Sequence, residues 1–143
     1  MPKASPPQRG VYEVSAEHVG ALECAGLLPR LPARVTTHDV YGERPTEADR
    51  AGMRWFVTGD IHRPSGVMAL RPRFHFAWMR RTLEIEHIAG SRFGVGRLLR
   101  EAQNIAREAG VPLSGETALG NIEMLQFAAK AGFRRDRMRM TWP

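Results

Sequence analysis

Hydrophobic and polar residues alternate with a two-residue period through the middle of the chain. The runs RWFVT (54–58) and VMALR (67–71) flank a turn segment that contains two glycines, and this pattern predicts an antiparallel pair of strands. A further strand is predicted over 82–89. Strict alternation there puts two sets of side chains on opposite sides of the strand: Leu83, Ile85 and His87 on one, and Glu84, Glu86 and Ile88 on the other.

Apolar residues at helical spacing follow this region. They predict a helix over about 95–109 that stops at Gly110 and Pro112. Ser15 is the predicted N-cap of an earlier helix running toward Leu28, in which Cys24 is expected to be buried. Another helix is predicted to begin near Asn121.

The remaining segments carry weaker patterns. They predict a strand over 33–41, a short helix that starts near Thr46 and ends before Met53, a strand in LSGETAL (113–119) and one final strand in FRRDRMRMTW (133–142). FHFAWM (74–79) fits either an edge strand or a loop that faces the substrate.

Composition and length point to one globular domain. The chain has 143 residues and is 43% apolar, which suits a single core, so residues 11–143 are assigned to one domain and 1–10 to a flexible leader. No apolar stretch approaches the roughly 20 residues of a membrane span, and a cytoplasmic protein with no membrane partner is expected.

Charge adds a preference for anionic partners. The net charge is +6, and arginines concentrate in 71–81 and in 133–140. These clusters fit a solvated face, the phosphates of a cofactor or a nucleic acid. Cys24 is the single cysteine and the five histidines are scattered, so neither a disulfide nor a metal site is expected.

The segment IAGSRFGVGRLL (88–99) places two glycines between a predicted strand and a predicted helix. The first amides of a helix are unpaired, and glycine at positions 94 and 96 lets an anion approach them. Arg92 and Arg97 add positive charge there. Alternatively, the glycines only reverse the chain direction, since the third glycine of the dinucleotide fingerprint is replaced by Leu99.

The order of these parts resembles the GCN5-related N-acetyltransferase (GNAT) superfamily. The resemblance covers the second half of the chain, from LEIEHIAGSRFGVGRLL (83–99) to NIEMLQFAAKAGF (121–133). It implies an α/β (α+β) fold with a mixed, mostly antiparallel central sheet flanked by helices. It also implies that acetyl-CoA is the co-substrate and that no metal is required.

The resemblance implies a set of residues for acetyl-CoA. Its pyrophosphate would meet the turn Q/R-x-x-G-x-G/A, whose first position is Ser91 here, and Ile88 to Gly90 would polarise the thioester. The positions assigned to acetyl-CoA are Ile88, Ala89, Gly90, Ser91, Arg92, Phe93, Gly94, Val95, Gly96, Arg97 and Asn121.

Two carboxylates are candidates for the general base. Glu84 and Glu86 are predicted to share a strand face, and Glu84 is preferred because it is expected nearer the open substrate cleft. Alternatively both are solvated, and His87 is expected to pack in the core. The family's frequent tyrosine, which can protonate the CoA thiolate, aligns with Ala128, so water, Ser114 or Thr117 would replace it.

The function assigned to the sequence is acetyl transfer from acetyl-CoA to an amine of a small molecule or a protein, by direct attack. The alternatives are a catalytically silent acyl-CoA-binding regulatory module, which Ala128 favours, and a basic nucleic-acid-binding domain. A homodimer is compatible with this fold.

Overall fold

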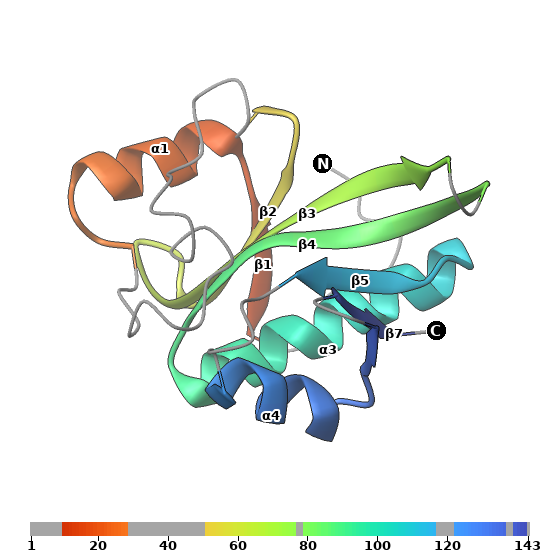
Figure 1. Cartoon of the computed structure of the whole chain (residues 1–143). Coiled ribbons are helices and arrows are strands. Elements are labelled where there is room, and N and C mark those ends of the chain that lie inside the picture. The colour runs from red at the N-terminus through yellow and green to blue at the C-terminus, as the bar shows by residue number, and fades with distance from the viewer. Residues whose placement is uncertain (1–9, 29–50, 77–78, 117–121, 137–138, 143) are drawn as a thin grey trace.

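One mixed sheet with helices on both faces makes up the described part of the chain (Figure 1). The computed structural model describes residues 10–28, 51–76, 79–116, 122–136 and 139–142. The strands are β1 (Val11–Val14), β2 (Arg54–Asp60), β3 (Arg63–His75), β4 (Arg80–Gly90), β5 (Leu113–Glu116), β6 (Arg134–Asp136) and β7 (Arg139–Trp142). The helices are α1 (Ala16–Cys24), α3 (Arg92–Ala109) and α4 (Ile122–Lys130).

The strand order is β1-β2-β3-β4-β5-β7-β6. All neighbouring pairs are antiparallel except β4 and β5, which are parallel because α3 carries the chain back across the sheet between them. The predicted α+β fold with a mostly antiparallel sheet is therefore confirmed.

Each face of the sheet has its own apolar core. On one face, Leu98 and Leu99 of α3 pack with strand residues such as Phe56, Leu70 and Ile85. On the other, Val19 of α1 packs with Trp55, Val57 and their neighbours. Figure 1 shows α1 on one side of the sheet and α3 with α4 on the other. Both faces are covered because the β2 and β3 runs are apolar at successive positions.

A β-bulge in β4 changes the predicted side-chain pattern. Ala69 pairs with His87 while Leu70 pairs with Ile85, so Glu86 is an extra residue on β4. Beyond the bulge the alternation is reversed. Ile88 lies in the α3-side core with Leu83 and Ile85, and the His87 ring lies 6.1 Å from that of Trp55 on the α1 side. The predicted sides of His87 and Ile88 are therefore wrong.

Several other predictions can be compared directly. The strand pair at 54–58 and 67–71 is confirmed, as are the Ser15 cap and the stop of α3 at Gly110, whose φ of 69° is left-handed. Helix α1 ends at Cys24, which is exposed instead of buried. The predicted final strand is two antiparallel strands, β6 and β7. Residues 1–9 of the predicted leader, the strand predicted over 33–41 and residues 46–50 of the short helix predicted before Met53 lie outside the described residues.

Candidate functional site

Strand β4 runs into helix α3 through a single residue, Ser91. Its side chain caps the helix by accepting a hydrogen bond from the Gly94 amide at 3.0 Å, and its own amide donates to the Ser65 carbonyl at 2.8 Å. The two glycines of the predicted turn thus lie within the first turns of α3. Among the described residues, the amides of Arg92 and Phe93 are left as anion donors at this helix end.

Gly90 and Gly94 are required by close packing. A Cβ on Gly90 would lie 2.5 Å from the Ser65 carbonyl oxygen, and φ there is +149°. A Cβ on Gly94 would lie 3.1 Å from the same oxygen and 3.0 Å from Ser91 Oγ. These glycines let α3 start directly against the first residues of β3, so their role is structural.

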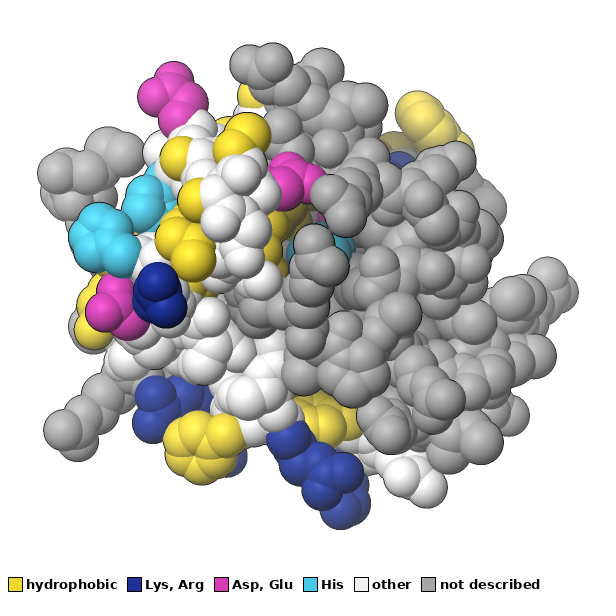
Figure 2. Space-filling model, turned by 90° about the vertical axis from the view of Figure 1, so that its left-hand side faces the viewer, with side chains coloured by type: hydrophobic (Ala, Val, Ile, Leu, Met, Phe, Trp, Pro, Cys, Tyr) yellow, Lys and Arg dark blue, Asp and Glu magenta, His cyan; other side chains and the backbone are white. Residues whose placement is uncertain are grey.

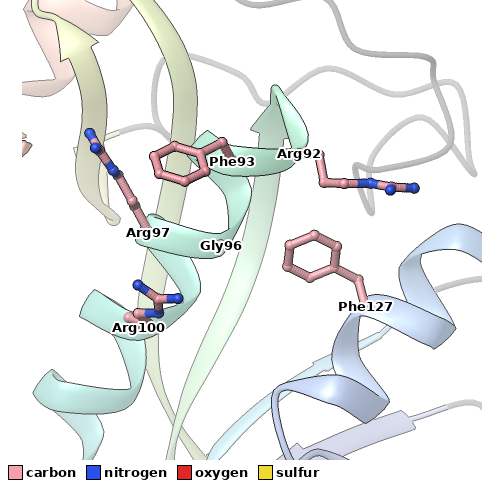
Figure 3. A pocket seen from close by; sticks show the side chains of 6 residues that line it. All are labelled: Arg92, Phe93, Gly96, Arg97, Arg100 and Phe127. Atoms are coloured by element: carbon pink, nitrogen blue, oxygen red, sulfur yellow. The ribbon is translucent and has the colours of Figure 1, made fainter.

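Gly96 has a different environment. A Cβ there would meet only the Phe127 ring, at an ordinary 3.5 Å, and Gly96 lies on the side of α3 that faces a groove toward α4 (Figure 3). The groove has a volume of about 340 Å³. It is lined by Arg92, Phe93, Gly96, Arg97, Arg100 and Phe127. The absence of a side chain at position 96 keeps its floor open.

Positive charge dominates this groove. Three arginines line it, and no carboxylate does so among the described residues. The Arg97 guanidinium lies 4.6 Å from the centroid of the Phe93 ring, which holds it by a cation–π contact. In Figure 2, Lys and Arg side chains form a band along the lower part of the face, with hydrophobic side chains between them. The groove can therefore bind an anion that also carries an apolar or aromatic group.

Strands β4 and β5 pair over a short stretch only. Leu83, Glu84 and Ile85 pair with Leu113, Ser114 and Gly115, and from Glu86 onward β4 pairs with β3 alone within the described part of the chain. The β4 bulge lies where this pairing ends. Beyond this point no described residue pairs with β4 on the β5 side, next to the start of α3.

Glu84 and Glu86 are brought together by Arg73 of β3. Arg73 Nε lies 3.2 Å from Glu84 Oε2 and donates a hydrogen bond to Glu86 Oε1 at 2.8 Å. The predicted shared face of the two carboxylates is confirmed. Glu84 is buried within the paired part of β4, whereas Glu86 stands where the pairing with β5 ends.

Two buried hydroxyls lie beside Glu84. Ser114 pairs with Glu84 across β4 and β5, and Thr82 is two residues before it on the same face. Both hydroxyls are buried with no hydrogen-bond partner in the described residues. Ser114 is fully buried, which does not suit its suggested role as a proton donor to a departing thiolate.

Three residues of this region were not predicted from the sequence, and two predicted residues cannot be compared with the structure. Arg100 and Phe127 of the groove, and Arg73 beside the carboxylates, were not predicted. Arg100 could have been found, because it lies seven residues, or two turns, after Phe93 and therefore on the same side of a helix. Asn121 and Thr117 lie outside the described residues.

Solved structures share this architecture. An N-acetyltransferase from Staphylococcus aureus superposes with a TM-score of 0.65 at 12% identity, covering 92% of this chain and 95% of that one. A protein from Novosphingobium aromaticivorans described as a GNAT-family acetyltransferase gives 0.64 at 16% identity over 99% of this chain and 58% of that one. The chain has the GNAT fold. AAC(6')-Ib in complex with paromomycin and acetyl-CoA gives 0.57 at 16% identity, covering 92% and 91%.

The GNAT fold is shown here by structure and not by sequence. No protein-family model and no curated sequence matches the chain. Within the described residues, no group of three metal-binding side chains is present and no helix is long and apolar enough to cross a membrane.

Proposed function

We propose that this GNAT-fold chain is an N-acetyltransferase that transfers the acetyl group of acetyl-CoA to an amine. The observation that carries the proposal is the groove at the start of α3, where free amides, three arginines and the open floor at Gly96 lie together. The groove begins where β4 ends, and from Glu86 onward β4 has no described strand partner on the β5 side, so a long cofactor would reach from the phosphate-binding end toward this edge of the sheet.

The residues fit the proposed co-substrate. The pyrophosphate would be held by the amides of Arg92 and Phe93 and by the Arg92 guanidinium. Its negative charge would lie at the positive end of the helix dipole. The edge of β4 from Glu86 to Gly90, which has no described strand partner on the β5 side, would supply a backbone donor for the thioester oxygen. Bound acetyl-CoA supplies the acetyl thioester, and its thiolate leaves when the amine attacks.

The acceptor amine must lose a proton during the transfer. We propose that Glu86 or Glu84 accepts it, directly or through a water, with Glu86 preferred because it stands where the strands separate. Arg73 positions both carboxylates. Ala128 offers no hydroxyl to the thiolate, which would take its proton from solvent.

A silent acyl-CoA-binding module is the second candidate. Ala128 favours this module, because alanine cannot donate a proton as the tyrosine frequent at this position in the family can. The Ala128 side chain is buried in the α3-side core.

Two measurements test the proposal in sequence. Acetyl-CoA at about 100 times its Kd should stabilise the protein by about 2.7 kcal/mol, seen as a higher melting temperature. Release of free thiol is then followed with a panel of small amines and peptides. The absence of any thermal shift would contradict the proposal, and a shift without transfer to any acceptor would support the silent module.

A further inference from the structure

At one end of the sheet, β3 and β4 continue as a two-stranded arm. Beyond Leu70, β3 pairs with β4 alone, because its pairing with β2 ends there. Among the described strands, β5 pairs with β4 only from Leu83 onward, so the first three residues of β4 also lie outside the sheet. Three strand residues span about 10 Å. The arm, residues 71–75 with 80–82, therefore projects from the sheet, and its turn lies furthest out (Figure 1).

The turn of this arm carries exposed apolar side chains. Phe76 is 80% exposed and Met79 is 75% exposed, and the Met79 amide closes the turn by donating a hydrogen bond to the Phe76 carbonyl at 3.2 Å. The Phe74 ring is also exposed and contacts the Phe76 ring edge to face, with centroids 5.0 Å apart. Turns usually hold glycine or polar residues. Apolar side chains at the end of an arm indicate a surface that is covered in a complex.

Met79 occupies a strained backbone position. Its φ of 47° lies in the left-handed region, where glycine or asparagine is the usual residue. Glycine would relieve this strain, and an exposed methionine adds no packing to the arm. Strained residues of this kind are typical of functional sites. A binding role for the side chain explains why methionine stands here.

Positive charge lies directly behind the apolar turn. Arg80 and Arg81 are exposed, and as consecutive strand residues they project from opposite faces of the arm. Residues 71–83 contain four arginines and no acidic residue. Moving inward from its turn, the arm thus presents first apolar side chains and then guanidinium groups.

We infer that this arm docks the protein on an anionic membrane surface. Phe76 and Met79 enter the boundary between lipid headgroups and acyl chains, and Arg80 and Arg81 bind the lipid phosphates, so the arm matches the order of the layers in a bilayer. The expectation that the protein has no membrane partner rests on the lack of an apolar span in the sequence. Docking through a surface arm needs no such span.

Single-stranded nucleic acid is the alternative partner for arginines beside aromatic rings. The arm fits it less well, because the Phe74 and Phe76 rings pack edge to face on each other and Met79 has no ring on which a base could stack. The arm and the groove at the start of α3 lie at opposite ends of β4, about 30 Å apart along the strand. Docking on a membrane therefore leaves that groove free.

Vesicle binding tests the inference. Kd values of the full chain are measured by co-sedimentation with vesicles of phosphatidylcholine alone and of an equal mixture of phosphatidylcholine and phosphatidylserine. The variants are Phe76→Ser, Met79→Gly and Arg81→Ala, which change exposed side chains only. Ile61→Ser is the matched apolar control, because Ile61 is exposed in the β2–β3 turn. Arg107→Ala is the matched charge control, because Arg107 is exposed on α3.

The parent should bind the anionic vesicles and bind phosphatidylcholine alone weakly. Phe76→Ser should weaken binding about ten-fold or more, because a large apolar side chain no longer leaves water. Arg81→Ala should weaken it about five-fold, the usual effect of one cation near an anionic surface. Met79→Gly should also bind more weakly, while its melting temperature does not fall. Ile61→Ser and Arg107→Ala should match the parent.

The contrary results are distinct. A parent that does not bind anionic vesicles would overturn the inference, and so would arm variants that bind as tightly as their controls. Binding of a labelled oligouridylate that depends on the arm, without binding of vesicles, would assign the arm to nucleic acid instead. The thermal shift expected with acetyl-CoA is independent of all these outcomes, so failure of the inference leaves the proposed function intact.

Discussion

The two ends of β4 offer different kinds of chemistry. At its C-terminal end the chain presents amides of α3 and exposed arginines, and the groove there is open to solvent. Toward its N-terminal end it carries Glu84 and Glu86, which are largely buried and share one guanidinium, that of Arg73. The first end can bind an anion without rearrangement, whereas the second holds charges that already have partners.

The difference shows how each end is encoded. The C-terminal end depends on the capping residue, the glycines and a helix, which are neighbours in sequence. The arrangement around Glu86 depends on a bulge and on Arg73, which comes from another strand. Local sequence specifies the first end, and strand register specifies the second.

The largest expected effect concerns the carboxylate end. Replacing the base by glutamine should lower turnover by about two to four orders of magnitude at neutral pH, which is the usual contribution of general-base catalysis. Glu86→Gln is expected to have this effect, and Glu84→Gln a smaller one. The loss should shrink as pH rises, because free amine becomes abundant. Initial rates from pH 6 to 10 would measure it.

Glu108→Gln on the exposed end of α3 is the control for that pair and should keep the parent rate. If neither Glu84→Gln nor Glu86→Gln changes the rate with an accepted amine, the proton is lost to bulk solvent and the carboxylates are structural.

Strand β4 also shows where prediction from sequence reaches its limit. Alternation correctly placed Leu83, Ile85 and the two glutamates, since all four lie at or before the bulge. It failed at His87 and Ile88, because a single inserted residue reverses the side of everything after it. No residue type in EIEHIA marks a bulge; the insertion is determined by pairing with β3.

A smaller effect is expected at Ala128 on α4. The side chain is 2% exposed and packs in the α3-side core, so tyrosine there should lower the free energy of unfolding by about 1–3 kcal/mol through overpacking. If the missing phenol limits thiolate release, the folded variant should still turn over faster than the parent. Thermal melting and thiol release measured on the same sample would check both effects.

Ala129→Tyr is the matched control, because Ala129 is the exposed neighbour on the same helix. It should change neither stability nor rate. An Ala128→Tyr protein that binds acetyl-CoA but transfers no faster would contradict a role for the absent hydroxyl.

The helix end was predictable for physical reasons that are local. A capping serine, an apolar helical face and a left-handed glycine define α3 within its own sequence, and only its start was placed three residues too late. The groove was not predictable to the same extent. Phe127 comes from α4, and its approach to Gly96 depends on how two helices pack on one sheet face.

The smallest effect compares the two glycines that the sequence alone treats alike. Gly96→Ala should raise stability by about 0.5–1 kcal/mol, since alanine favours a helix and its Cβ meets only Phe127 at 3.5 Å. Gly94→Ala should lower stability, because its Cβ would press on the Ser65 carbonyl at 3.1 Å. The Gly96→Leu protein should remain folded but bind CoA weakly, because the leucine side chain fills the groove. Urea unfolding measures the change in stability of the three variants, and calorimetry measures their affinity for CoA. A Gly96→Leu protein with the parent's affinity would show that CoA does not occupy the groove.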